Sequence, residues 1–366
     1  MRLDRVWLTD FRSYEHIEIE LDDGLTAVVG ANGIGKTNLL EAIGLLATLK
    51  SFRGAPTDSL IRRGSERAII RAEGERDGRP VLIELELAPG KSRAQVNRQK
   101  LQRTRDLLGA LRVTVFAPDD LTLVKDGPAV RRDFVDDLAV ALDPKHDRTL
   151  SDFDRALRQR NALLRTAGGR LDESAELTLD VWDTQLAQLG SVVLDRRYDV
   201  LEQLVPLASA CYRTLAADDT DLTADYLTSW SDGSLLVALT QSRDNDVRRG
   251  VSTVGPHRDE IAFSIDGFAS RTEASQGEQR TLALALRLGG HRLVTDRIGE
   301  PPLLLLDDVL SELDPDRAHA LLSTLPPGQT VITSAAALPA ATRPDTLLVH
   351  DPSAVRAGGF VRKRTE

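Results

Sequence analysis

The chain has 366 residues, of which 41% are hydrophobic and 28% are charged, and its formal net charge is −9. This composition is typical of a globular protein with one large domain or two ordinary ones. It excludes a membrane-embedded chain, because no apolar run approaches the roughly 18 residues of a spanning helix, and it argues against coating nucleic acid by bulk attraction. The N-terminal residues carry charges throughout, so no secretory signal is expected and the cytoplasm is the expected location.

The first third of the chain has mainly strand-like patterning. Alternation of apolar and polar residues predicts a hairpin over residues 6–21, and a buried strand follows at Leu25–Val29. After a glycine loop, leucines at helical spacing predict a helix over residues 36–49. A second hairpin is predicted at residues 68–88, and a strand at 111–118 that ends at Pro118.

From about residue 128 the patterning becomes helical for more than a hundred residues. Pro128, Pro144, Pro206 and the glycine turn at 167–174 are expected to divide it into pieces. No heptads are sustained, so no coiled coil is expected. Beyond residue 250 we expect strands at 260–267, 303–306 and 329–335, helices from Ser275 and over 316–325, and a mobile basic tail from residue 356.

The single cysteine, Cys211, lies in an apolar helical stretch and is predicted to be a core residue. Two stretches are strongly basic. Lys91–Arg105 holds six basic residues and no acidic one, and residues 50–71 hold six basic residues against Asp58 and Glu66. Such segregation on an acidic chain indicates a local basic face, with a solvated surface as the open alternative.

The most specific motif is "GANGIGKT", which matches G-x-x-x-x-G-K-[S/T] between a predicted strand and a predicted helix. Backbone amides of such a P-loop and the helix N-terminus bind phosphate, the lysine reaches the terminal phosphates, and the threonine hydroxyl ligates Mg²⁺. The P-loop residues are Gly30, Ala31, Asn32, Gly33, Ile34, Gly35, Lys36 and Thr37.

Four leucines followed by "DD" predict a strand buried on both faces that ends in Asp307 and Asp308. Asp307 is then placed to hold Mg²⁺ in the manner of a Walker B aspartate, and Asp308 to orient or deprotonate the attacking water. The alternative is a pair of helix N-cap residues.

The turn "SQGE", which consists of Ser275, Gln276, Gly277 and Glu278, opens a helix of Leu and Ala. Its hydroxyl, amides and helix dipole can form an anion site. Ser275 and Glu278 also have the spacing of a capping box. The sequence allows both interpretations at once.

The order of P-loop, SQGE turn, acidic strand and "SELD" resembles the ABC-type ATPase heads. The resemblance narrows to the RecF family of bacterial DNA replication and repair proteins, on seven collinear motifs between residue 8 and about 334. These are "FRSYEHIEIEL" (Phe11–Leu21), "GANGIGKTNLLEAI", "KSFRG" (Lys50–Gly54), "PDDLTLVKDGPAVRRDFVD" (Pro118–Asp136), "GPHRDEIAF" (Gly255–Phe263), "SQGEQRTLALALRL" and "LLLLDDVLSELD".

The resemblance implies an α/β fold, an ABC-type P-loop ATPase head with mixed β-sheets around the P-loop helix, an inserted helical lobe and no long coiled coil. The expected division is an ATPase lobe from residues 1–125 and 251–366 with a helical lobe at 126–250. The resemblance implies that residues 30–37 bind ATP, that Thr37 and Asp307 serve Mg²⁺, and that Lys36 and Asp308 are catalytic. It also implies that residues 275–279, the signature turn, complete the ATP site of a second subunit.

The family further implies an ATP-dependent homodimer on DNA, especially at junctions of single and double strand. It implies work with RecR and RecO in loading RecA at gaps, and slow hydrolysis that releases the dimer. Four alternative hypotheses are a nucleotide-binding subunit of an ABC transporter, a structural-maintenance-type head, a small-molecule P-loop kinase and a non-catalytic DNA scaffold. The absence of heptads argues against a structural-maintenance-type head, and a P-loop kinase would leave the second half of the chain unexplained. The intact Lys36, Thr37 and Asp307 argue against a non-catalytic scaffold.

Several positions stay open. Residue 308 is Asp where transporters have Glu, and Glu278 stands where they have Gln, so it is either a cap or a phosphate neighbour. The strand at 329–335 lacks the transporters' switch histidine and offers only Thr333 or Ser334 near that place. His257 and Arg258 have no derived role, and Arg131 and Arg132 either pair with acids or relay nucleotide state. The predicted DNA-binding face consists of Arg53, Arg62, Arg63, Arg93, Arg98, Lys100 and Arg103.

Overall fold

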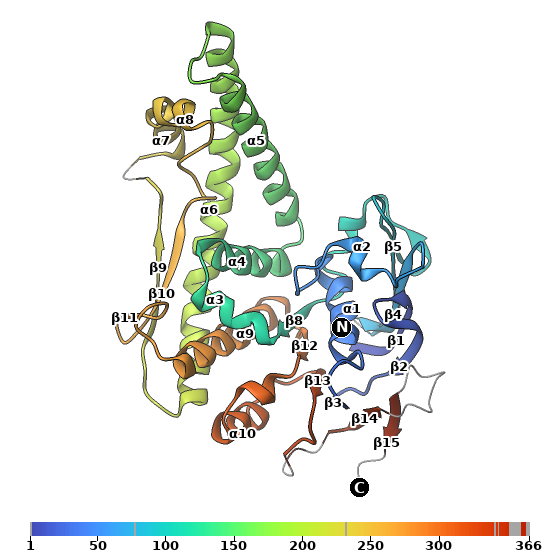
Figure 1. The fold of residues 1–366 in the computed structure, drawn as a ribbon. Coiled ribbons are helices and arrows are strands. Elements are labelled where there is room, and N and C mark those ends of the chain that lie inside the picture. Colours follow the sequence, from blue (N-terminus) through green and yellow to red (C-terminus); the bar gives the residue numbers. More distant parts are fainter. Residues whose placement is uncertain are drawn as a thin grey trace. The chain divides into compact units, whose positions relative to one another are not determined.

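The computed structural model describes residues 2–76, 78–230, 233–339, 342, 344–350 and 360–363. The chain forms two compact units (Figure 1). Unit 1 consists of Met1–Leu121, Ala210–Asp218 and Ala283–Glu366, and unit 2 of Thr122–Ser209 and Asp219–Leu282. The assignment of an ATPase role and a helical-lobe role to segments divided at residues 125 and 250 stays a prediction.

The first sheet of unit 1 is antiparallel and contains both predicted hairpins. Its strand order is β2-β1-β4-β5-β6-β7. The strands are β1 (Arg2–Phe11), β2 (Tyr14–Glu20), β4 (Ala68–Arg76), β5 (Arg79–Leu87), β6 (Arg93–Val96) and β7 (Gln99–Lys100). Because β1 pairs with β2 and β4 with β5, the hairpins expected at 6–21 and 68–88 are confirmed.

The second sheet of unit 1 is mainly parallel, with the order β15-β14-β3-β13-β12-β8. The strands are β15 (Phe360–Lys363), β14 (Thr346–His350), β3 (Leu25–Val29), β13 (Thr330–Ser334), β12 (Leu303–Leu306) and β8 (Val113–Phe116). All four leucines of β12 are buried, as expected for a strand covered on both faces.

The expectation of a mobile tail is wrong for residues 360–363, which pair with β14 in antiparallel fashion. The physical reason is burial of Phe360, whose ring lies edge-on to that of His350 with centroids 5.8 Å apart. The remainder of the tail lies outside the described residues.

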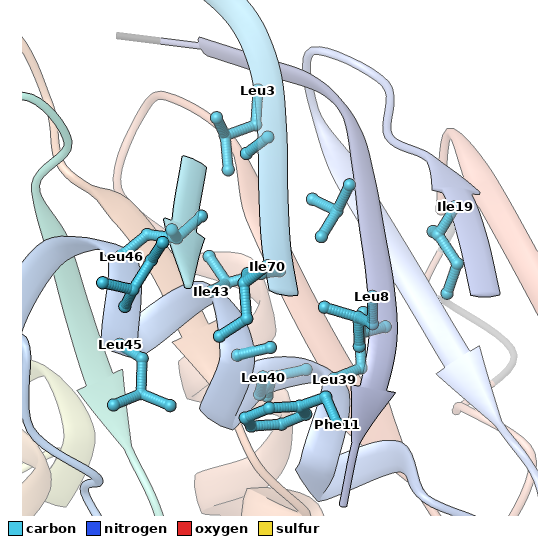
Figure 2. Packing of buried hydrophobic residues seen from close by; sticks show 14 of the residues in the cluster. Leu3, Leu8, Phe11, Ile19, Leu39, Leu40, Ile43, Leu45, Leu46 and Ile70 are labelled. Carbon is cyan, nitrogen blue, oxygen red and sulfur yellow. The ribbon is translucent and has the colours of Figure 1, made fainter. Parts of the chain in front are cut away.

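Helix α1 (Lys36–Thr48) lies between the two sheets and carries the centre of the core. It contacts β1, β4 and β5 of the first sheet and β8 and β13 of the second. Its apolar face presents Leu39, Leu40 and Ile43, all fully buried, and Figure 2 shows them packed toward side chains of β1 and β4 such as Phe11 and Ile70. This packing fixes the start of α1, where the P-loop ends.

Short elements complete unit 1. They are α2 (Thr57–Leu60), η1 (Thr104–Leu107), η2 (Pro118–Leu121), η3 (Val309–Glu312) and α10 (Pro315–Ser323). Cys211 is buried, as predicted for a core residue.

Unit 2 is mainly helical and has one small sheet of order β11-β10-β9. Its elements are α3 (Thr122–Lys125), α4 (Pro128–Leu142), α5 (His146–Thr166), α7 (Leu235–Gln241), α8 (Arg243–Arg249), β9 (Leu222–Leu227), β10 (Glu260–Ile265) and β11 (Phe268–Ala269). Helices α6 (Glu173–Ala216) and α9 (Gln276–Ile298) contribute residues to both units. Among the described residues, no helix is both long enough and apolar enough to cross a membrane.

The break expected at Pro206 is wrong, because α6 continues through it for 44 residues in all. An interior proline removes one helical hydrogen bond and crowds the preceding turn. Buried side chains on either side, at Leu204 and Ala208, hold the helix against its neighbours and offset this loss.

Candidate functional site

The carboxyl ends of three neighbouring parallel strands meet at one edge of the second sheet. The P-loop follows β3, Asp307 follows β12, and Thr333 lies near the end of β13. Ligands of open α/β sheets bind outside the carboxyl ends of the strands. The sheet therefore brings the predicted P-loop and the predicted Walker B aspartate to the same place.

The P-loop requires its glycines for backbone conformation and for space. Gly33 has φ 83° and Gly35 has φ 110°, in the region that side-chain-bearing residues rarely adopt. A Cβ atom on Gly35 would also lie 2.7 Å from the hydroxyl oxygen of Tyr14. The tight turn into α1 is therefore possible only without a side chain at position 35.

Lys36, the first residue of α1, is almost completely buried, with 6% of its surface exposed. Its Nζ donates hydrogen bonds to the carbonyl oxygens of Gly30 at 2.6 Å and Ala31 at 2.9 Å, so the ammonium group lies within the curve of the loop. Burial lowers the pKa of Lys36, and the nearby carboxylates of Asp308 and Asp307 oppose that shift. The ammonium group of Lys36 is thus held at the place where the backbone amides of the loop would bind a phosphate.

Asp307 is buried and shares one carboxylate oxygen between two hydroxyl donors. Its Oδ1 accepts from Thr37 Oγ1 at 2.9 Å and from Thr333 Oγ1 at 2.7 Å. Burial raises the pKa of this carboxyl, and the two hydroxyl hydrogen bonds counteract the rise. Thr37 and Asp307 together offer only oxygen donors, the ligand type that Mg²⁺ selects, so they fit the predicted metal role.

Asp308 has a left-handed backbone, with φ 49°. It stands at the N-cap position of η3, but its side chain makes no capping hydrogen bond. Its carboxylate is instead close enough to Lys36 to oppose the lowering of the lysine's pKa by burial. The N-cap alternative therefore describes only the backbone at Asp308, and its carboxylate lies near the lysine of the P-loop.

Thr333 connects the two aspartates and was only a weak candidate in the sequence. Its hydroxyl donates to Asp307 Oδ1 and accepts from the backbone N–H of Asp308 at 2.9 Å, while the residue itself is fully buried. One hydroxyl thus fixes both the carboxylate of one acid and the strained backbone of the next.

Replacing Thr333 by Val is expected to lower the free energy of unfolding by about 1–3 kcal/mol, because the N–H of Asp308 loses its acceptor in a buried place. Thr333→Ser keeps the hydroxyl and is the matched control. Urea unfolding followed by circular dichroism compares the two. Equal stability of the valine and serine variants would show that the hydroxyl does not hold this edge.

Three consecutive residues at the turn from β1 into β2 bind the P-loop helix and its N-cap residue, Gly35, and the sequence assigned none of them. Arg12 makes a bidentate pair with the buried Glu41 at 2.8 and 2.7 Å. Ser13 accepts from Asn38, and the hydroxyl of Tyr14 donates to the carbonyl of Gly35 at 3.0 Å. The motif "FRSY" was visible in the sequence, but nothing in it indicates a partner on α1.

The signature turn, residues 275–279, belongs to unit 2 and forms a complete capping box. Glu278 Oε2 accepts from the N–H of Ser275 at 2.6 Å, and Ser275 Oγ accepts from the N–H of Glu278 at 3.3 Å. Gln279 is buried and donates to the carbonyls of Ser270 and Arg271. Glu278 therefore closes the capping box around the N-cap Ser275, and whether it also neighbours a phosphate stays a prediction. Ser275 and Gln276 remain exposed.

The seven predicted DNA-binding residues divide into two groups. Three lie beside acids: Arg53 is 3.9 Å from Glu41, Arg62 contacts Asp10 and Glu15, and Arg93 is 3.8 Å from Glu86. Arg53 also bonds Asn38 of α1 and counteracts the rise in the pKa of Asp307, which places it near the P-loop site. Within the described part of the chain, no ion pair is formed by Arg63, Arg98, Lys100 or Arg103.

Among the open positions of unit 2, Arg131 pairs with an acid, whereas Arg132 and His257 contact backbone carbonyls. Arg131 is buried and bonds the carboxylate of Glu260 at 2.8 to 3.0 Å, and Arg132 donates to the carbonyl of Asp259 at 2.5 Å. Nε2 of His257 lies 3.3 Å from the carbonyl of Ser252, and burial lowers the pKa of His257 to about 4. All of these contacts lie within unit 2, and a role in relaying nucleotide state stays a prediction.

An antiparallel sheet and a mainly parallel sheet enclose a P-loop helix, with an acid-tipped strand beside the loop and a signature turn at the mouth of α9. This arrangement has the fold of an ABC-type head. The solved head of an Smc protein bound to the C-winged helix domain of ScpA shares this fold, with a TM-score of 0.58 and 18% identity over 100% of this chain and 98% of that one.

The family model described as "RecF/RecN/SMC N terminal domain" matches residues 2–335. The DNA replication and repair protein RecF of Streptomyces avermitilis is 43% identical over 352 residues, covering 92% of this chain and 94% of the relative. RecF of Kineococcus radiotolerans is 40% identical over 396 residues, covering 99% and 100%. The chain belongs to the RecF family. A solved structure of the recombination mediator protein RecF-ATPrS in the RecFOR pathway has a TM-score of 0.89 and 29% identity, covering 99% and 98%.

Proposed function

We propose that this protein is an ATP-dependent DNA-binding protein of DNA replication and recombinational gap repair, and that ATP and Mg²⁺ drive its dimerisation on DNA. Two solved relatives are described as RecF-ATPrS and RecF-ATP, and each is similar over 99% of this chain. The observation that carries the proposal is the group formed by Lys36, Thr37, Asp307 and Asp308 at one sheet edge.

Each member of this group has one task in the proposed ATP site. Lys36 and the backbone amides of the loop bind the terminal phosphates of ATP. The curvature of the loop keeps the ammonium group of Lys36 close to those amides. Thr37 and Asp307 hold Mg²⁺, which supplies neutralisation of the charge that develops on the phosphates. Asp308, with a carboxylate that is not used as a cap, orients or deprotonates the attacking water.

The signature turn supports a site completed by a second copy of the chain. Ser275 and Gln276 are exposed, and in the described structure the N–H groups of Gln276 and Gly277 have no hydrogen-bond partner. These amides open helix α9, so they attract anions. The capping box keeps the Glu278 carboxylate turned toward Ser275, which leaves the amides for a phosphate bound by the partner.

The DNA role rests on the relatives, which are named DNA replication and repair proteins. We propose binding at junctions of single-stranded and double-stranded DNA, and cooperation with RecR and RecO in loading RecA at gaps, because the solved relative is described as a recombination mediator in the RecFOR pathway. For this role the protein would be located in the cytoplasm, where the bacterial chromosome lies. Strand β13 ends in Thr333 and Ser334, without the switch histidine of a transporter subunit, which favours this role over transport.

Asp308→Asn tests the hydrolytic part of the proposal. We expect ATP hydrolysis to fall by about 10²–10³-fold, because a general base is lost, while ATP still binds and the dimer persists. Asn tolerates the left-handed backbone of position 308 as Asp does, so the fold is retained. Phosphate release measures the rate and sedimentation measures the dimer, with Asp316→Asn in the first turn of α10 as control. Hydrolysis at the wild-type rate would remove Asp308 from the reaction.

A further inference from the structure

The turn of the β6–β7 hairpin in unit 1 contains a residue type that is disfavoured in a turn of this conformation. Gln95 pairs with Lys100 and Val96 with Gln99, so the loop consists of Asn97 and Arg98 alone. Both have positive φ, at 50° and 66°. A two-residue loop with positive φ at both positions is a type I′ turn, for which Asn-Gly is strongly preferred.

Arg98 occupies the position that favours glycine, where its Cβ strains the left-handed backbone. Asn97, by contrast, suits its position and anchors the turn, because its Oδ1 accepts from the N–H of Leu82 at 2.8 Å and its own N–H donates to the carbonyl of Leu82 at 2.8 Å. The Arg98 side chain makes no hydrogen bond or ion pair within the described ranges of the chain, so local structure does not account for an arginine here, and a functional constraint can.

The charges of the hairpin are arranged so that its outer end is unpaired. On the neighbouring strand β5, Glu84 is bonded by Arg71 and Gln95, and Glu86 lies near Arg67 and Arg93. Arg98 and Lys100 of the hairpin, and Arg103 in the segment between β7 and η1, are exposed and form no ion pair with any residue that the structure describes. β7 is also the last strand of its sheet, which leaves this basic end open to a partner.

From this geometry we propose that the β6–β7 hairpin and the segment directly after it bind duplex DNA, with Arg98 and Lys100 of the hairpin and the following Arg103 contacting backbone phosphates. The inference rests on the proposed DNA-binding function and names the element that performs it. A two-stranded ribbon fits a groove of double-stranded DNA. Single strands are bound largely by stacking on aromatic side chains, and residues 91–105 contain no aromatic residue.

Arg98→Gly gives the sharpest test, because the two properties of this residue change in opposite directions. Glycine relieves the left-handed strain, so the melting temperature rises by about 1–2 °C. Loss of one phosphate contact weakens binding to a mixed-sequence duplex several-fold and reduces the slope of log K against log salt by about 0.9. The triple variant Arg98→Gly, Lys100→Gln, Arg103→Gln reduces that slope by about 2.7.

Binding is measured by fluorescence anisotropy with ATP and Mg²⁺, on a duplex and on a single strand of equal length. Two controls accompany it: Arg98→Lys keeps the charge, and Arg71→Gln removes a paired cation from the same sheet. Both are expected to retain the wild-type salt slope.

The outcomes separate the hairpin from the general function. If the wild-type protein binds no DNA, the proposed function itself fails. If it binds but Arg98→Gly leaves affinity and salt slope unchanged, only the role of the hairpin is overturned. A loss confined to the single strand, or equal on both probes, contradicts the assignment to duplex DNA.

Discussion

Lys36→Met is expected to weaken ATP binding by about 100-fold or more, equivalent to about 2.7 kcal/mol. Lys36 is buried, and its ammonium group is held among the loop carbonyls by bonds of 2.6 and 2.9 Å. A charged donor in such a place contributes roughly 1.5–3 kcal/mol for each hydrogen bond to a charged phosphate oxygen. Methionine fills a similar volume and supplies no donor.

Isothermal titration calorimetry with ATP and Mg²⁺ measures this loss. Lys50→Met, which changes a lysine beyond the end of α1, is the matched control and is expected to bind ATP as the wild type does. Wild-type affinity in Lys36→Met would contradict the assignment of residues 30–37 as the phosphate-binding loop.

Ser275→Arg is expected to abolish ATP-dependent dimerisation while the monomer still binds ATP. Ser275 is exposed at the mouth of α9 and belongs to unit 2, whereas the P-loop belongs to unit 1. A long side chain at this position blocks the amides of Gln276 and Gly277 from a partner's phosphate. It also removes the N-cap of α9, at a cost of about 1 kcal/mol.

A second N-cap in the same unit provides the control. Its loss lowers stability as the loss of Ser275 does, but leaves the signature turn intact. Ser234 caps α7, where its side chain accepts from the N–H of Val237. Ser234→Arg is expected to lose similar stability and to dimerise normally. Equal dimerisation of the two arginine variants, measured by sedimentation with ATP, would remove the signature turn from the interface.

The sequence allowed prediction of the features that are formed by residues close together along the chain. The P-loop was predictable because its glycines, lysine and threonine stand together between a strand and a helix. Asp307 was predictable because four leucines identify a strand covered on both faces, and carboxyl ends of parallel strands meet at one edge. The capping box of Ser275 and Glu278 follows from their spacing, and the structure confirms it.

Contacts between distant residues were not predictable in this way. The bonds of Thr333 to Asp307 and Asp308, and of Arg12 to Glu41, depend on which strand lies beside which helix. No local pattern states that. The continuation of α6 through Pro206 has the same origin, because packing of buried side chains outweighs a local helix-breaking preference.

The basic segments show a further limit of sequence reasoning. Counting charges grouped Arg62 and Arg93 with Arg98 on one face, and that grouping stays a prediction. The fold adds that acids lie beside the first two, whereas Arg98 forms no ion pair with a residue in the described ranges. The signal that distinguishes Arg98 is the turn. Its type depends on the pairing register of β6 and β7, which the sequence does not give.

The central claim is that one chain's signature turn completes the ATP site of another, so ATP controls association. Sedimentation equilibrium of the wild-type protein, with and without ATP and Mg²⁺, tests it most directly, with Lys36→Met as the variant that should never respond. We expect a monomer without nucleotide and a species of twice the monomer mass when ATP and Mg²⁺ are both present. A mass that is the same in both conditions would contradict it.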